Sequence, residues 1–323
     1  MATLLREADV ERVIKMEPII EAVAAAMREL GDGIAENIPR RRIYPPGNVL
    51  HVMFASFPGS GYYGLKSYSI GGGKVRFLVV LYRQDGEDAG NIDALIEGNL
   101  LGAYRTGAAS GVAARELAPP GAVEVGVIGS GWQARTQIHA ISRTIPVTRF
   151  RVFSRDPERR TAFAAELSEV LGIDAVAVGS AEEAVRGAPV VVTMTNSGSP
   201  VLDADWIEPG ALVIAAGSNI PNKTELPPEL VQRAEVVVVD QLDAAKIESG
   251  DLLMAEASGH FDWDGVVELG AILAGKAQGR RSPDGIVLFE SHGLALWDVA
   301  AGAYVLQEAR RIRLGSEVSF FPE

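Results

Sequence analysis

A glycine-rich turn between an apolar strand and a helical segment constrains the fold of this chain more than any other feature. The apolar run Val123–Ile128 is followed by Gly129-Ser130-Gly131-Trp132-Gln133-Ala134. This is the G-x-G-x-x-A pattern of dinucleotide-binding proteins, in which the glycines allow a tight turn and a close approach of the pyrophosphate to the backbone. The alanine lets helix and strand pack closely, and the free N–H groups of the helix N-terminus favour an anion. We therefore expect Gly129, Ser130, Gly131, Gln133 and Ala134 to bind a dinucleotide.

The chain that follows this turn alternates between strand-like and helix-like segments. Candidate strands lie at 123–128, 149–153, 175–178, 190–194, 212–216 and 236–239, and candidate helices at 132–144, 156–171, 181–187 and 227–233. Such alternation predicts a doubly wound parallel sheet with helices in its connections. We expect a Rossmann dinucleotide-binding domain over residues 119–298.

The first 118 residues follow a different pattern. Apolar residues recur at helical spacing over 8–31, and three β-rich runs at 49–54, 62–68 and 75–82 follow one another without intervening helices, which predicts an antiparallel sheet. An alanine-rich helical stretch over 92–117 ends at Pro119, and a last helix over 294–311 could return to this first domain. The expected fold class is α/β. It combines the Rossmann domain with a second α/β lobe, made of residues 1–118 plus 299–323 and containing a mainly antiparallel sheet.

The end of the second Rossmann strand bears on which dinucleotide binds. An acidic residue there would hold the ribose 2′-OH of NAD, but the sequence reads Phe153-Ser154-Arg155. Ser154 and Arg155, with Arg159 nearby, could bind a 2′-phosphate through charge-assisted hydrogen bonds. We therefore expect NADP(H) in preference to NAD(H). The alternative is that Asp156 caps the next helix and the arginines are merely solvated.

Composition excludes several classes of function. The chain has 30 basic and 42 acidic residues, a net charge of −12, which argues against a nucleic-acid partner. It has no cysteine, its four histidines are scattered, and it lacks a G-x-S-x-G elbow, so we expect neither a metal site nor a serine or cysteine nucleophile. The apolar runs are shorter than the roughly 20 residues of a membrane helix. The charged N-terminal stretch is unlike a signal peptide, so a cytoplasmic protein without a membrane partner is expected.

Several segments, taken in order, resemble the ornithine cyclodeaminase/μ-crystallin family over nearly the whole chain. They are Gly64-Leu65-Lys66, the run 97–110 with Arg105-Thr106-Gly107, the loop 129–134, the run 217–226 and, more weakly, the run 293–298. The resemblance implies a Rossmann lobe, a second lobe whose open sheet forms a homodimer interface, and a substrate held between the lobes against the nicotinamide. Members of the family move a hydride at the carbon of a C–N bond next to a carboxylate.

The resemblance also implies roles for individual residues. Arg105 matches the arginine that binds the substrate carboxylate, and a second arginine is expected just before the 49–54 strand, where spacing to Lys66 favours Arg42 and then Arg40. Lys66 matches the active-site lysine, which binds substrate and exchanges a proton with it when burial lowers its pKa. Thr106, Ser291 and Gly293 are expected to contact the cofactor, because they lie where the family approaches it.

Asn219 is a departure from the family pattern. Cyclodeaminases and some dehydrogenases of the family have an aspartate at this place, and asparagine cannot take up a proton at neutral pH. Ornithine cyclodeaminase activity is therefore disfavoured, while Asn219 stays a candidate catalytic residue that orients a substrate amine or a water. The alternative is a turn residue ahead of Pro221.

These features together predict an NAD(P)-dependent oxidoreductase that acts on a small imino or amino acid, of the ketimine reductase or amino-acid dehydrogenase type. One alternative is an ornithine cyclodeaminase-type lyase that uses tightly bound NAD to form proline and ammonia. An alternative of another class is an NADPH-linked, crystallin-like ligand-binding protein.

Overall fold

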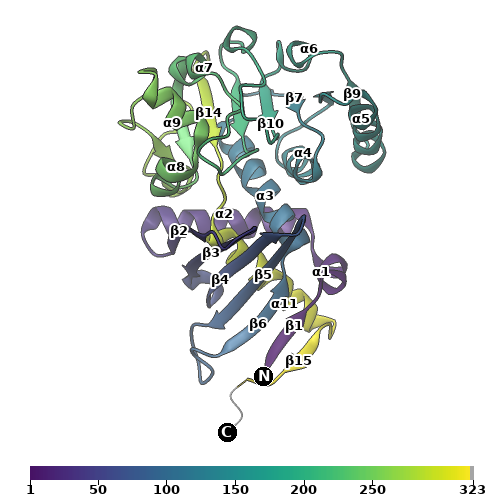
Figure 1. The fold of residues 1–323 in the computed structure, drawn as a ribbon, viewed down its shortest axis with the longest axis vertical. Coiled ribbons are helices and arrows are strands. Elements are labelled where there is room, and N and C mark those ends of the chain that lie inside the picture. Colours follow the sequence, from purple (N-terminus) through teal and green to yellow (C-terminus); the bar gives the residue numbers. More distant parts are fainter. Residues whose placement is uncertain (321–323) are drawn as a thin grey trace. The chain divides into compact units, whose positions relative to one another are not determined.

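The computed structural model of the protein describes residues 1–320 and divides into two compact units (Figure 1). Unit 1 contains residues 1–108 and the C-terminal segment from Leu294, and unit 2 contains residues 109–293. Each unit has its own sheet, one mixed and one parallel, so the expected α/β fold class is confirmed.

The sheet of unit 1 has seven strands in the order β15-β1-β6-β5-β4-β3-β2. The strands from β2 to β6 pair with one another in antiparallel fashion, whereas β1 runs parallel to β6. A two-residue turn joins β4 to β5, and both of its residues, Gly72 and Gly73, have a positive φ, as this hairpin turn requires. The strands are β1 Ala2–Leu5, β2 Glu36–Ile43, β3 Asn48–Phe57, β4 Tyr62–Gly71, β5 Lys74–Arg83, β6 Ile92–Glu97 and β15 Ser316–Val318.

Four helices accompany this sheet: α1 Glu7–Val13, α2 Met16–Asp32, the first half of α3 Asn99–Leu117, and α11 Ala295–Arg311. Helix α11 packs on β2 to β5 and against α2, where the indole of Trp297 donates a hydrogen bond to Met27 Sδ at 3.0 Å. Helix α11, which lies near the C-terminus in the sequence, therefore completes the hydrophobic core of unit 1 with its apolar face.

Two helices expected from the sequence are corrected by the structure. The segment 8–31 is two helices rather than one, because Ile14 and Lys15 have extended backbone conformations. The first part of the stretch 92–117 is strand β6 rather than helix. Its backbone pairs on both sides, with β5 and with β1, and Gly98 separates it from α3.

The sheet of unit 2 has eight parallel strands in the order β13-β12-β14-β11-β10-β7-β8-β9, which confirms the doubly wound architecture. The strands are β7 Glu124–Ile128, β8 Arg149–Phe153, β9 Asp174–Ala177, β10 Val190–Thr193, β11 Leu212–Ala215, β12 Ala234–Val239, β13 Val267–Glu268 and β14 Ile286–Glu290. Strand β14, which the sequence analysis missed, is fully buried between β11 and β12.

The connections of this sheet carry α4 Trp132–Thr144, α5 Pro157–Leu171, α6 Ala181–Val185, α7 Pro228–Arg233, α8 Leu242–Glu248, α9 Gly250–Ala257 and α10 Leu269–Leu273. From β7 the chain proceeds to β8 and β9 on one side, and then returns to β10 on the other side of β7. This reversal leaves a crevice at the carboxyl ends of β7 and β10, where ligands of such sheets bind.

The division between the units falls inside α3, between Ala108 and Ala109, whereas the proline pair suggested residues 118 and 119. The helix continues unbroken to Leu117, and Gly111 in its second half lies directly against Ala140 of α4. At the other end, unit 1 takes the whole of α11 from Leu294 rather than from residue 299.

Candidate functional site

A cavity of about 750 Å³ opens in unit 2 at the carboxyl ends of β7, β8, β10 and β11. It is lined by residues 128–133, 153–156, 159, 194–197, 199–201 and 217. The cavity lies at the reversal point of the sheet, and the glycine-rich turn forms part of its wall. Its place matches the one where open parallel sheets bind dinucleotides.

The two glycines of the turn are required for different structural reasons. Gly129 has a φ of 120°, and a Cβ there would overlap the carbonyl of Met194. A Cβ at Gly131, by contrast, would meet no atom within 4 Å, so the open space beside its backbone is available to a ligand. Gly131 is the N-cap of α4, which places the N-terminal N–H groups of that helix at the turn. These residues fit a pyrophosphate.

The end of β8 and the residues that follow it form another part of the cavity wall. Phe153, Ser154, Arg155 and Arg159 all line it. The carboxylate of Asp156 caps α5, accepting hydrogen bonds from the N–H groups of Glu158 and Arg159 at 3.1 Å each. Asp156 is therefore engaged by the helix, as the alternative interpretation expected, and the strand end itself carries no acid.

Unit 1 holds a buried group of charged side chains on the inner face of its sheet. Lys66 Nζ of β4 donates to Asp298 Oδ1 of α11 at 2.8 Å, and Arg105 Nε of α3 donates to the same oxygen at 3.1 Å. Lys66 is 2% exposed and Asp298 is completely buried. Arg105 Nη1 is also buried and has no hydrogen-bond partner among the residues that the structure describes. The structure thus brings together two of the residues selected from the sequence and adds Asp298.

The register of β2 to β5 decides where the three neighbouring arginines lie. Lys66 pairs with Met53 and Val79, and two residues along the sheet Tyr68 pairs with His51 and Phe77. Arg42 pairs with His51, so it lies in the same row across the sheet as Tyr68 and Phe77. Arg40 is buried, and its charge acts on Lys66, whereas Arg41 is exposed.

The surroundings lower the pKa of two titratable groups on this face. Burial and the charge of Arg105 lower the pKa of Lys66 to about 8, although Asp298 opposes them. Burial, with Arg42 and Arg40, lowers the pKa of His51 to about 4, so this ring is neutral at physiological pH. It stacks on Tyr68 at 4.1 Å between ring centroids. A lysine whose pKa lies near neutrality can serve as a proton donor or acceptor.

Asn219 lies in the loop after β11, in unit 2, and is half-buried. This loop is fixed by Glu225, whose carboxylate accepts hydrogen bonds from Gly217 N at 2.8 Å, Thr195 N at 2.6 Å and Thr193 Oγ1 at 3.1 Å. Thr195 and Gly217 line the dinucleotide cavity. Glu225 therefore ties together two segments of the cavity wall.

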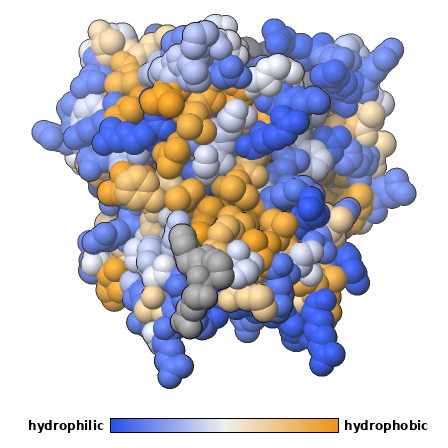
Figure 2. Space-filling view, turned by 60° about the horizontal axis from the view of Figure 1, so that its bottom comes forward, coloured by the Kyte–Doolittle hydropathy of each residue, from blue (hydrophilic) through white to orange (hydrophobic). Residues whose placement is uncertain are grey.

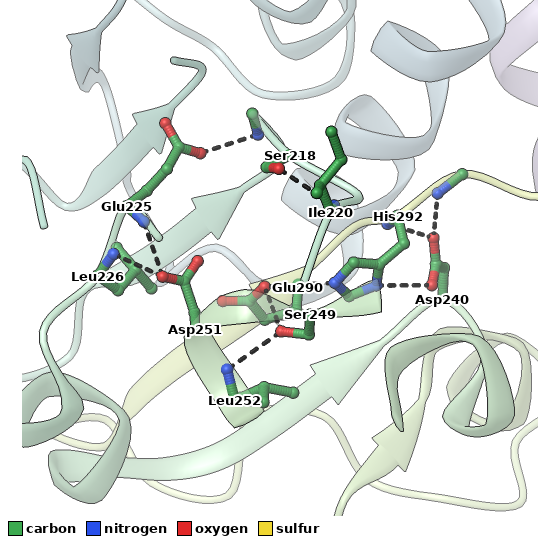
Figure 3. Close-up of polar contacts among 12 residues, drawn as sticks. Ser218, Ile220, Glu225, Leu226, Asp240, Ser249, Asp251, Leu252, Glu290 and His292 are labelled. Atoms are coloured by element: carbon green, nitrogen blue, oxygen red, sulfur yellow. Dashed lines mark hydrogen bonds and ion pairs between the residues drawn. The ribbon is translucent and has the colours of Figure 1, made fainter. Parts of the chain in front are cut away.

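Glu225 is the first member of a buried polar network that sequence reasoning missed (Figure 3). Asp251 accepts hydrogen bonds from the backbone N–H groups of Glu225 and Leu226. Farther along the network, His292 lies between two carboxylates, with its Nδ1 3.5 Å from Asp240 Oδ1 and its Nε2 3.6 Å from Glu290 Oε2. The sequence did contain a signal for this network, namely an acidic residue directly after an apolar strand, as at Asp240, or at its end, as at Glu290.

The remaining cofactor candidates lie apart from the cavity lining. Ala134 is buried in α4. Thr106 Oγ1 donates to the carbonyl of Gly102 in α3, Ser291 N bonds the carbonyl of Ala215, and Gly293 N donates to Asp240. Contacts of Thr106, Ser291 and Gly293 with a cofactor stay predictions.

Comparison with known proteins places the chain in a family. The model of the ornithine cyclodeaminase/mu-crystallin family matches residues 1–312. The protein belongs to this family. A Δ1-pyrroline-2-carboxylate reductase of Bacillus cereus is 35% identical over 228 residues, 70% of each chain.

Two solved structures match nearly the whole chain. The Thermococcus litoralis Δ1-pyrroline-2-carboxylate reductase, in complex with NADH and L-proline, has a TM-score of 0.92 at 31% identity and covers 98% of this chain and 100% of its own. An archaeal alanine dehydrogenase, a dimer with bound NAD, has a TM-score of 0.92 at 31% identity, over 99% of both chains. Both structures thus contain NAD(H), and the names of all three relatives are those of reductases or dehydrogenases.

Two further features bear on the expected partners. Within residues 1–320, no helix is both long and apolar enough to span a membrane. In the same part of the chain, no three histidine or acidic side chains are grouped as metal ligands would be.

Proposed function

We propose that the protein is an NAD(P)H-dependent oxidoreductase that acts at the carbon of a C–N bond beside a carboxylate, in an imino or amino acid. The observation that carries the proposal is the buried Lys66 and Arg105 pair of unit 1, in which one guanidinium nitrogen has no partner among the described residues. The names of the relatives support it, because pyrroline-carboxylate reductase and alanine dehydrogenase both denote reactions of this class.

Arg105 is the proposed binding group for the substrate carboxylate. A guanidinium binds a carboxylate through two parallel hydrogen bonds, which also fixes the orientation of the neighbouring carbon. The Nε of Arg105 is held by Asp298, and its buried Nη1, which has no hydrogen-bond partner among the described residues, remains for the substrate. Burial of Arg40 and its effect on Lys66 favour Arg40 over Arg42 as the second cation near the carboxylate.

Lys66 is the proposed proton donor. Reduction of an imine adds a hydride to carbon and a proton to nitrogen, and a bound reduced nicotinamide supplies the hydride. The ammonium of Lys66 would supply the proton, because its pKa of about 8 leaves it mostly charged at neutral pH and still able to release a proton. In the oxidative direction the neutral amine would take the proton back.

The cavity of unit 2 is the proposed dinucleotide site, with the pyrophosphate at Gly129–Gly131 and the adenosine ribose near Ser154. We propose a preference for NADPH, since Arg155 and Arg159 line this end of the cavity and no acid stands at the strand end. The carboxylate that would reject a 2′-phosphate in NAD-specific enzymes is absent at residues 153–155.

The test is a turnover assay that follows the absorbance of the reduced nicotinamide. NADPH or NADH is mixed with Δ1-pyrroline-2-carboxylate, or with 2-oxo acids plus ammonia or methylamine, and K66M serves as the inactive control. We expect loss of one reduced cofactor per imine consumed. A second arm gives L-ornithine with NAD, and proline and ammonia formed without net cofactor change would instead establish a cyclodeaminase. Tight NADPH binding without turnover in either arm would favour a ligand-binding protein.

We also propose that the protein is a homodimer. Figure 2 shows a face of the molecule on which apolar side chains gather. The outer face of the unit 1 sheet exposes apolar and aromatic side chains, namely those of Ile38, Phe54, Tyr63 and Leu78. An exposed apolar sheet face of this kind marks an interaction site. Sedimentation should give a dimer, and F54D should shift the protein to monomer; a monomeric wild type would contradict the proposal.

A further inference from the structure

We propose that Asp298 is a positioning residue of the reaction, which holds the Lys66 ammonium and the Arg105 guanidinium in place through one shared carboxylate oxygen. The inference rests on the proposed function, because it assigns to Asp298 the task of presenting the proton donor and the carboxylate-binding group together. Asp298 acts only through these two side chains.

The geometry brings three distant parts of the chain to one oxygen atom. Lys66 comes from β4, Arg105 from α3 and Asp298 from the start of α11, and both cations donate to Oδ1, at 2.8 and 3.1 Å. All three side chains are at least nine-tenths buried. Gly102 supplies the room, since a Cβ there would lie 3.0 Å from Lys66 Nζ. A small residue one turn before Arg105 thus lets the lysine reach Asp298.

The arrangement is unlike that of the other buried aspartate of unit 1. Asp93 has both carboxylate oxygens occupied, by Arg83, Arg310 and Tyr62, so its hydrogen-bonding capacity is used within the fold. At Asp298, by contrast, Oδ2 and the Nη1 of its partner Arg105 have no hydrogen-bond partner among the described residues. Burying charge this incompletely is costly if its only role is structural.

The surroundings of Lys66 make Asp298 decisive for its charge. The groups that face Lys66 are Arg40 of β2, Met53 of β3, Val79 and the ring of Phe77 of β5, Arg105 of α3 and Asp298 of α11. Both arginines and burial favour the neutral amine, whereas Asp298 favours the ammonium and keeps the pKa of Lys66 at about 8. Without the aspartate this pKa would fall further, and Lys66 would lose its proton at neutral pH.

Asp298 has a second consequence, for Arg105. Because Asp298 accepts from Nε, the guanidinium plane is held at one edge, and the ring of Trp297 lies 5.6 Å from its central carbon. The buried Nη1, which has no hydrogen-bond partner among the described residues, is then left for a substrate carboxylate. A substrate carboxylate and the proton donor are thus placed by the same carboxyl group.

The experiment compares D298N with D93N, a matched change of the other buried aspartate. Titration of the Lys66 side-chain nitrogen is followed by NMR in protein labelled at lysine, with K66R to assign the signal, and the pH profile of kcat/KM is measured alongside. We expect D298N to lower the pKa of Lys66, moving the alkaline limb of the profile to lower pH by about one unit or more, and to reduce kcat roughly tenfold near pH 8. D93N should lower Tm but change neither the pKa of Lys66 measured by NMR nor the pH profile of kcat/KM.

A folded D298N protein whose Lys66 titrates as in the wild type would overturn the inference. If D298N does not fold, D298E decides: the charge is kept but displaced by one methylene, so we expect a lower kcat at unchanged Tm, and an unchanged kcat would refute the inference. The NMR titration needs no turnover. An inactive wild type with a shifted Lys66 in D298N would therefore reject the proposed function alone, and an active wild type with an unshifted Lys66 would reject the role of Asp298 alone.

Discussion

At the scale of single residues, Arg105 is the group whose substitution should report most directly on substrate binding. Its Nη1 is buried without a partner in the described chain, while Nε is held by Asp298. We expect R105K to keep the charge but lose the two parallel hydrogen bonds, at about 1.4–2.8 kcal/mol, which corresponds to a roughly 10- to 100-fold rise in KM for the carboxylate substrate. Steady-state kinetics measure it. R115K is the control, because Arg115 lies on the same helix and is paired with Glu116; an equal effect in both variants would contradict the assignment.

The proposed preference for NADPH also depends on single side chains. Arg155 lines the cavity beside Ser154, and a hydrogen bond from a guanidinium to a phosphate is of the charge-assisted kind. We expect R155A to raise the Kd for NADPH about 10- to 100-fold and to leave the Kd for NADH nearly unchanged. Nucleotide fluorescence gives both constants. R149A, at the opposite end of the same strand and paired with Asp174, should change neither. Equal weakening of both nucleotides by R155A would refute a 2′-phosphate contact.

At the scale of secondary-structure elements, Glu225 fixes the segments that follow β10 and β11. Its carboxylate accepts from the N–H groups of Thr195 and Gly217, which line the cavity, and from Thr193 Oγ1. In E225Q one acceptor becomes an amide donor facing an N–H group, so we expect a Kd for the dinucleotide about tenfold higher, together with a lower Tm. T193V removes a single neutral donor and should have a smaller effect. Unchanged binding in E225Q would show that these segments do not need Glu225.

Local pattern predicted the elements that repeat a single signal and missed those whose signal depends on distant partners. The glycine-rich turn, the following strands and the β4–β5 hairpin are encoded within a few residues. Strand β6 was taken for helix because its six residues precede a true helix, and only pairing with β1 and β5 makes it a strand. Lys66 and Arg105 were found through family motifs. Asp298 and Glu225 lay inside matched segments, but their roles depend on side-chain contacts that sequence spacing does not show.

At the scale of the whole molecule, net charge conceals the local charge of the proposed substrate site. The chain carries −12, yet the inner face of the unit 1 sheet presents Arg40, Arg42, Lys66 and Arg105 against Asp298. A small cationic cluster within an acidic protein attracts a small anion and gives nucleic acid no extended basic surface. Composition therefore argues against a nucleic-acid partner, but only the fold locates the cationic cluster.

The two units should also respond oppositely to pH. In unit 1, burial of His51 and Lys66 lowers their pKa values to about 4 and about 8, so the folded unit binds fewer protons than the unfolded chain and gains stability as pH rises through each window. In unit 2, burial raises the pKa of Glu225 to about 7. Burial opposes protonation of His292, but Asp240 and Glu290 prevail and raise its pKa to about 10. Folded unit 2 thus binds more protons, and its stability falls from about pH 4.5 to about pH 10.

Amide hydrogen exchange, expressed as protection factors, separates these responses. Between about pH 6 and about pH 9.5 we expect protection in the strands β10, β11 and β14 to fall at least tenfold relative to that in β3, β4 and β5, since one pKa unit corresponds to about 1.4 kcal/mol. E225Q should reduce the part of this fall that lies below about pH 7, because the amide cannot titrate, whereas Asp251, whose pKa burial raises to about 8, and His292 keep the rest. Parallel changes in both units would contradict the argument, because the buried groups would then not control the stability of the unit that contains them.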